Sequence, residues 1–158
     1  MAAKTLTFDT GIVTYDLNGA ATVRFNPTDA AFVERLSKVF ADLAAEQVKW
    51  QTDVEEINDV EEFGERSTKM FDYANQRDTE MRGLIDGLLG EGVSDAVFPD
   101  INCYALADGL PVWVNLLFAI AEEVNAAYTA EQKKTDPRVK SYSDKYEALL
   151  QKYQNRKK

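Results

Sequence analysis

The side chains that most often carry out catalysis are scarce in this sequence. The chain contains no histidine, the residue most used for proton transfer near neutral pH, and its one cysteine is Cys103. A Ser-His-Asp or Cys-His arrangement therefore cannot be built, and a zinc site would lack thiolates. Nothing among residues 102–105 would lower a thiol pKa, so we expect Cys103 to be a small buried apolar residue. A single cysteine excludes an internal disulfide and is compatible with a reducing cytoplasm.

Carboxylates are plentiful, but their spacing does not make them converge. Glu55 with Glu56, and Glu61 with Glu62, are adjacent on a predicted helix, where neighbouring side chains diverge by about 100°. Residues 95–108 lack the ligand spacing of a calcium loop, and the glycines of residues 83–92 lack the Lys-Ser/Thr of a phosphate-binding loop. We therefore predict no active site, no metal and no cofactor, and expect a protein that is not an enzyme.

The elements that would position any site lie in a chain of uneven charge. The 158 residues are enough for one domain with its own core, and the net charge is −9. Residues 1–132 carry 9 Lys and Arg against 24 Asp and Glu, whereas residues 133–158 carry 9 against 3. The net charge is thus −15 for residues 1–132 and +6 for residues 133–158. Because most of the chain is acidic, we do not expect a general nucleic-acid-binding protein. The acidic residues 1–132 could either mimic nucleic acid or form an ordinary acidic surface. The basic residues 133–158 could pack against protein, bind RNA or bind anionic lipid.

The N-terminal region has the pattern of a β-ribbon. Residues 5–8, 12–17 and 20–25 are rich in β-branched and aromatic residues, and Asn18-Gly19 is a strong signal for a type I′ turn. A two-residue turn would place Leu17 opposite Ala20 and Tyr15 opposite Thr22. Both faces would then be partly apolar, with Ile12, Val23 and Phe25 on one and Val13, Tyr15 and Leu17 on the other. Such a ribbon needs cover from a helix or from another copy of the protein.

Long helices are predicted after the ribbon. Thr28 or Asp29 can cap a helix reaching residue 57, whose roughly 28 residues would span about 42 Å. Asn58-Asp59 is the predicted turn, and a second helix follows, starting there or near Ser67, and ending at Gly90. Short helices are expected at residues 93–98 and 103–107, and a core helix from Leu110. Its apolar run, residues 110–121, is too short to span a membrane, and no export signal is visible.

A helix break is predicted at Thr135-Asp136-Pro137, followed by a last helix with an apolar stripe. The sequence thus predicts a mainly α protein with a small N-terminal antiparallel β-ribbon (α+β), as an elongated helical bundle or hairpin. The expected parts of this one structural domain are the β-ribbon of residues 1–26, the helical body of residues 27–135 and the basic C-terminal helix of residues 136–158.

Three stretches resemble a known family: RFNPTDAAFVERL at residues 24–36, RDTEMR at 77–82 and NCYALADGLPVW at 102–113. With the opening ribbon, they resemble the small tail assembly chaperones of long-tailed bacteriophages, over residues 4–140. The resemblance implies a non-enzymatic protein that coats the long, apolar, helical tape measure protein until tail tube subunits polymerise around it. It also implies location in the bacterial host cytoplasm, absence from the finished virion, and a longer form made by ribosomal slippage near Arg156-Lys157-Lys158.

A chaperone of this kind needs an apolar groove between helices and a charged exterior. The residues expected to form the groove are Trp50, Met70, Met81, Trp113, Leu117 and Phe118. The expected partners are the tape measure protein, the tail tube protein and other copies of this chain. The residues expected at contacts between copies are Tyr15, Leu17, Tyr142, Tyr146 and Tyr153. Two other functions fit the same sequence: a phage inhibitor or trigger of a host defence protein, acting through the acidic surface, and a structural tail or connector subunit.

Overall fold

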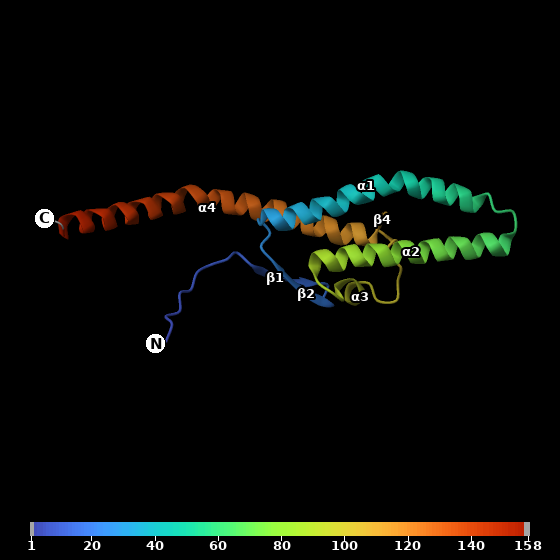
Figure 1. Ribbon diagram of the computed structural model, residues 1–158, viewed down its shortest axis with the longest axis horizontal. Coiled ribbons are helices and arrows are strands. Elements are labelled where there is room, and N and C mark those ends of the chain that lie inside the picture. The colour runs from blue at the N-terminus through green and yellow to red at the C-terminus, as the bar shows by residue number, and fades with distance from the viewer. Residues whose placement is uncertain (1, 157–158) are drawn as a thin grey trace.

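Three long helices and a small β-ribbon form an elongated molecule (Figure 1). The structure is a computed structural model and describes residues 2–156. Strands β1 (Val13–Leu17) and β2 (Ala21–Phe25) form the ribbon, and helices α1 (Ala30–Asn58) and α2 (Phe63–Leu89) form an antiparallel hairpin. The short helix α3 (Val93–Val97) and strands β3 (Leu106–Ala107) and β4 (Leu110–Pro111) precede α4 (Val112–Arg156). The predicted fold class, mainly α with an N-terminal antiparallel ribbon, is confirmed.

The ribbon has a different register from the predicted one. Asn18 and Gly19 both adopt positive φ, at 54° and 71°, and the Ala20 amide bonds to the Leu17 carbonyl, so the predicted turn is present. Leu17, however, pairs with Ala21 and Tyr15 with Val23, because Ala20 is an extra residue in the connection. This one-residue shift places the apolar residues of both strands on one face, so the prediction of two partly apolar faces was wrong.

The apolar face of the ribbon packs on the protein's own helices. The Phe25 ring stacks between Tyr15 and Phe32, with ring centroids 4.7 and 4.1 Å away, and the Tyr15 hydroxyl donates a hydrogen bond to Glu123 of α4 at 3.0 Å. The cover for the ribbon therefore comes from helices of the same chain. Residues 2–12 form no regular strand, so the strand predicted at residues 5–8 is wrong; Leu6 and Phe8 are exposed there.

The helix boundaries follow local capping. The Asp29 side chain accepts the Ala31 amide at 3.0 Å, and α1 ends at Asn58, as predicted. Helix α2 begins at Phe63 because the Glu62 carboxylate accepts the amides of Gly64 and Glu65; the alternative start near Ser67 is wrong. The predicted helix at residues 103–107 is also wrong, since the chain turns there into the β3–β4 hairpin around Asp108-Gly109.

The predicted break at Pro137 is absent, because α4 runs without interruption from Val112 to Arg156. A helical proline removes one amide donor, here the one that would bond to the Lys133 carbonyl. Residue 133 is exposed, so water can hydrogen-bond that carbonyl, and the helix continues. The basic C-terminal residues are thus a continuation of the core helix. At 1.5 Å per residue, the 45 residues of α4 span about 67 Å.

The core lies where the three long helices meet, at one end of the α1–α2 hairpin. Its helical members are Phe32, Leu36 and Val39 of α1, Met81, Ile85 and Leu88 of α2, and Trp113, Leu117 and Ile120 of α4. The far half of the hairpin has no fully buried apolar residue, and every residue from Tyr128 to Arg156 except Ser141 is exposed. No helix among residues 2–156 is long and apolar enough to cross a membrane.

The accessible surface shows how incomplete this packing is. A compact monomer of 17.7 kDa exposes about 7,900 Å² by the usual scaling with mass, whereas this chain exposes 11990 Å². Residues 2–12, the far half of the hairpin and the projecting end of α4 all contribute to this excess, since nearly all of their side chains are exposed or half-buried. These are surfaces that a partner could cover.

Candidate binding groove

Three of the six residues predicted to form a groove line the same hollow. Trp50 of α1 and Trp113 and Phe118 of α4 border a groove with a volume of about 610 Å³. We call this hollow the Trp50 groove. It lies between α1, the β3–β4 hairpin and the start of α4. Its full lining is Phe40, Leu43, Ala44, Gln47, Trp50, Arg77, Tyr104, Leu106, Leu110, Pro111, Trp113, Val114 and Phe118.

The other three predicted groove residues lie elsewhere. Met81 and Leu117 are fully buried among the three helices, where no partner can reach them, so their assignment to a groove was wrong. Met70 is half-buried on the far half of the hairpin and lines no part of the Trp50 groove. Helical spacing finds apolar stripes, but it does not distinguish the part of a stripe that meets the core from the part left open.

Exposed apolar residues lie at the rim of the groove. Phe118 is 47% exposed and stacks on Phe40 with ring centroids 5.7 Å apart, while Leu106 is 72% exposed. Sequence reasoning missed Leu106 and Leu110, because residues 103–107 were expected to be helical. The Asp108-Gly109 pair between these leucines is itself a hairpin signal, and it would have placed one leucine on each arm of a tight turn.

Arg77 lines the groove between two aromatic rings. Its guanidinium carbon lies 4.8 Å from the centre of the Trp50 ring and 4.1 Å from the centre of the Tyr104 ring, so the cation is held between two aromatic faces. Burial raises the pKa of the Tyr104 hydroxyl, and the charge of Arg77 opposes that rise. The sandwich fixes the position of Trp50.

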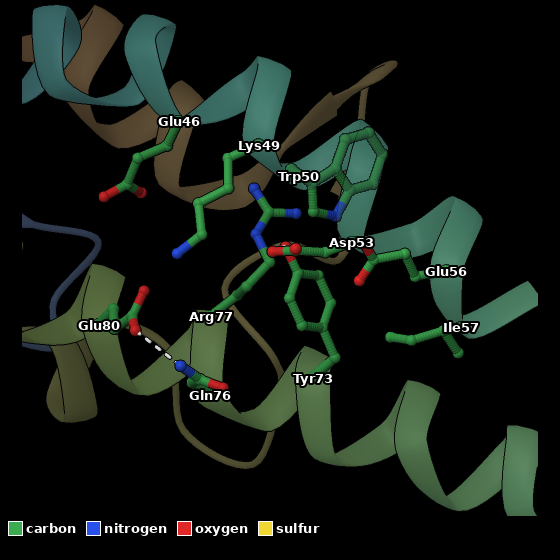
Figure 2. A pocket seen from close by; sticks show the side chains of 10 residues that line it. All are labelled: Glu46, Lys49, Trp50, Asp53, Glu56, Ile57, Tyr73, Gln76, Arg77 and Glu80. Carbon is green, nitrogen blue, oxygen red and sulfur yellow. Dashed lines mark hydrogen bonds between the residues drawn. The ribbon is translucent and has the colours of Figure 1, made fainter.

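An acidic cleft adjoins the groove on the other side of Trp50. It lies between α1 and α2, has a volume of about 420 Å³, and shares Trp50 and Arg77 with the groove. Figure 2 shows the carboxylates of Glu46, Asp53 and Glu56 from α1 and of Glu80 from α2 around it. With Lys49 and Arg77, its charges are four negative and two positive. We call it the acidic cleft.

A hydrogen bond spans the acidic cleft. The Tyr73 hydroxyl of α2 donates to Asp53 of α1 at 3.1 Å, in the half of the hairpin that lacks a buried core. Burial, followed by the neighbouring Asp53 carboxylate, raises the pKa of Tyr73 to about 12. The tyrosine is therefore neutral at physiological pH and acts as a donor that ties the two helices together.

The segments at residues 77–82 and 102–113 pack against each other below the groove. Asp78 accepts the Cys103 amide at 2.7 Å, and Arg82 donates to the Phe98 carbonyl at 2.9 Å. Cys103 is fully buried, as predicted, and burial together with Asp78 raises the pKa of its thiol to about 12. These hydrogen bonds hold in place the loop that carries Tyr104 and Leu106, two residues that line the groove.

The residues predicted at contacts between copies fall into two groups. Tyr15 and Leu17 lie on the ribbon face that packs on the chain's own body, and both are half-buried. Tyr142, Tyr146 and Tyr153 lie on the projecting part of α4 and are 71%, 52% and 57% exposed. The rings of Tyr142 and Tyr146 stack, with centroids 6.4 Å apart.

Residues 2–156 contain no group of three acidic or thiol side chains placed to hold a metal ion. Comparison with protein-family models, with curated proteins and with solved structures finds no match for this chain.

Proposed function

We propose that this protein is a bacteriophage tail assembly chaperone that binds apolar helical segments of the tape measure protein and keeps them soluble. The observation that carries the proposal is the Trp50 groove, an open apolar hollow whose rim residues Leu106, Leu110 and Phe118 are exposed to solvent. Grooves of this kind accept the apolar face of an amphipathic helix, and exposed apolar patches on soluble proteins commonly mark interaction sites. The tape measure protein is proposed as the partner because the sequence resembles the tail assembly chaperone family.

The groove suits a repetitive client. Its contacts are broad and apolar, made by aromatic and leucine side chains, and the acidic cleft beside it can orient the basic side chains of a bound helix. Such a site accepts many similar helices and demands no single sequence. Under this proposal the protein acts in the bacterial host cytoplasm as a binding protein without chemistry, and it is absent from finished virions.

Co-expression with the tape measure protein tests the proposal. The wild-type chain should keep the tape measure protein in the soluble fraction and co-purify with it. The Phe118→Ser variant should lose most of this effect. Unchanged solubility of the tape measure protein in the presence of the wild-type chain would reject the proposal.

The acidic end of the hairpin favours a second function. Residues 46–72 carry nine Asp and Glu against three Lys and Arg, and much of this charge is exposed. Dense negative charge can mimic nucleic acid, so the protein could inhibit or trigger a host defence protein. Binding to a host nuclease that weakens steeply with salt would favour this function. A structural tail or connector role would instead place the protein in purified virions, where immunogold labelling would detect it.

A further inference from the structure

The projecting part of α4 has the surface of a helix that needs a partner. Val139, Tyr142, Tyr146 and Leu149 follow steps of three, four and three residues, which place them on one stripe, and each is at least 52% exposed. Arg138, Lys145 and Lys152 are spaced seven residues apart and border this stripe on one side. The segment is therefore an amphipathic helix with an apolar stripe and a basic edge. We call residues 132–156 the tail.

The Trp50 groove and the acidic cleft together have the complementary surface. The groove offers apolar contact area, and the cleft beside it has the exposed carboxylates of Glu46, Glu56 and Glu80. A helix lying along both would place an apolar stripe on Phe118 and Trp50 and a basic edge on these carboxylates. We propose that the tail of one copy docks into the Trp50 groove and acidic cleft of a second copy of this chain.

The arrangement of α4 explains why the occupant is a second copy. Figure 1 shows the C-terminal end of α4 pointing away from the α1–α2 turn, at the opposite end of the molecule. Because α4 is one continuous helix, its tail cannot reach the groove of its own chain without a break. Docking in trans leaves α4 intact.

Charge also disfavours the simplest alternative, in which two tails pair with each other. In a parallel pair Arg138 would face Ser143 and Lys145 would face Leu150, neither of which carries a charge. In an antiparallel pair the basic row would face itself. The groove side offers several carboxylates, and residues 46–72 have a net charge of −6 against +6 for residues 133–158.

Docking of this kind is head-to-tail, since each copy offers one tail and one groove. Such contacts build closed rings or open filaments rather than two-fold dimers. The inference goes beyond the proposed client binding and does not require it, because it needs no tape measure protein. Since both partners would use the Trp50 groove, a bound client and a docked tail exclude each other.

The test is a charge exchange in the full-length protein, followed by mass photometry or analytical ultracentrifugation. One variant carries Arg138→Glu and Lys145→Glu on the tail, and the other carries Glu46→Lys and Glu80→Lys at the cleft. Each alone should weaken self-association about tenfold or more at low salt. Mixed together, the two variants should associate again, because each junction then joins opposite charges.

The matched control is Lys133→Glu with Lys140→Glu. Lys133 and Lys140 are also seven residues apart, and replacing both by Glu changes the net charge as much as the tail variant does. They lie on the side of the helix away from the apolar stripe. The control should associate nearly as the wild type does. Circular dichroism and thermal melting establish that every variant is folded.

Several outcomes would overturn the inference. A wild-type chain that stays monomeric at high concentration and low salt rejects docking in trans. An equal loss of association in the control, or no recovery on mixing, rejects the specific pairing of tail and groove. A separate result, self-association as proposed with no effect on tape measure solubility, would reject the client function and leave this inference standing.

Discussion

Arg82 donates from its Nε to both carboxylate oxygens of Asp78, at 3.1 and 3.0 Å. The remaining guanidinium nitrogens of Arg82 reach Asp95 and the carbonyls of Ser94, Phe98 and Ile101. One side chain of α2 thus fixes α3 and the loop that leads to the groove.

Removing this arginine should destabilise the protein strongly. In Arg82→Ala, Asp78 loses its cationic partner and three carbonyls lose a donor, so we expect a loss of roughly 2–4 kcal/mol in the free energy of unfolding. Urea unfolding followed by circular dichroism measures it. The exposed ion pair of Lys69 with Glu65 offers a control: Lys69→Ala should cost less than about 0.5 kcal/mol.

The Asp78 carboxyl should make the free energy of unfolding depend on pH in the acidic range. Burial alone would raise its pKa, but hydrogen bonds from the Cys103 amide and Arg82 hold the pKa below its usual value. A lowered folded-state pKa adds stability above the unfolded-state pKa of about 3.9, and this stability is lost as the pH falls through the folded value. The advantage of wild type over Asp78→Asn should therefore shrink between about pH 6 and about pH 3 in urea titrations. A constant difference over this range would contradict the assignment.

Cys103 should be unreactive in the folded protein. Its thiol is fully buried and has a pKa of about 12, so almost no thiolate is present near neutral pH. A thiol reagent such as dithionitrobenzoate should label the native chain only as fast as the core opens. In denaturant the single cysteine should react completely within the mixing time of a manual assay. Rapid labelling of the native chain would contradict the structure.

Trp113 is buried, but its indole N–H has no hydrogen-bond partner among residues 2–156. Phenylalanine keeps most of the ring contacts and removes the unsatisfied donor, so Trp113→Phe should cost less than about 1.5 kcal/mol. Trp113→Ala should cost about 3–5 kcal/mol, because it leaves a large cavity. Thermal melts of the two variants provide the comparison, and similar losses in both would show that the N–H is satisfied.

Groove binding should be separable from stability. Phe118→Ser changes a rim residue that is 47% exposed, and we expect it to reduce client binding at least about tenfold while the melting temperature falls little. Phe71→Ser is the matched control, since Phe71 is 68% exposed on α2 and lines neither the groove nor the acidic cleft. Pull-down of the tape measure protein should fail for the first variant and succeed for the second. Equal behaviour of both variants would count against the groove.

The sequence predicted the long elements of the fold because their signals are local. Apolar spacing and the Asp29 cap predicted α1, and Gly90 ended α2 as expected. The errors arose where a single residue changed the outcome. Ala20 shifted the ribbon register, Glu62 capped a helix with a side chain that is uncommon at that position, and Pro137 remained within a helix.

The groove was predictable only in part. Trp50 was identified because it continues an apolar stripe beyond the length that a small core can cover. Met81 and Leu117 belong to the same kind of stripe, yet they are buried, since the meeting point of three helices is a tertiary property. Arg77 lies between Trp50 and Tyr104, each of which is 27 positions away from it in the sequence. No local sequence pattern could have predicted contacts over that separation.

Helix α4 is continuous in its backbone but divided in its energetics. Its first turns are held by Trp113, Leu117 and Ile120 in the core, whereas beyond Tyr128 nearly every side chain is exposed and helical structure depends on local interactions. Pro137 lies within that second part and lacks the amide that would link it to the preceding turn. We therefore expect the tail to melt and re-form locally while the rest of the molecule stays folded.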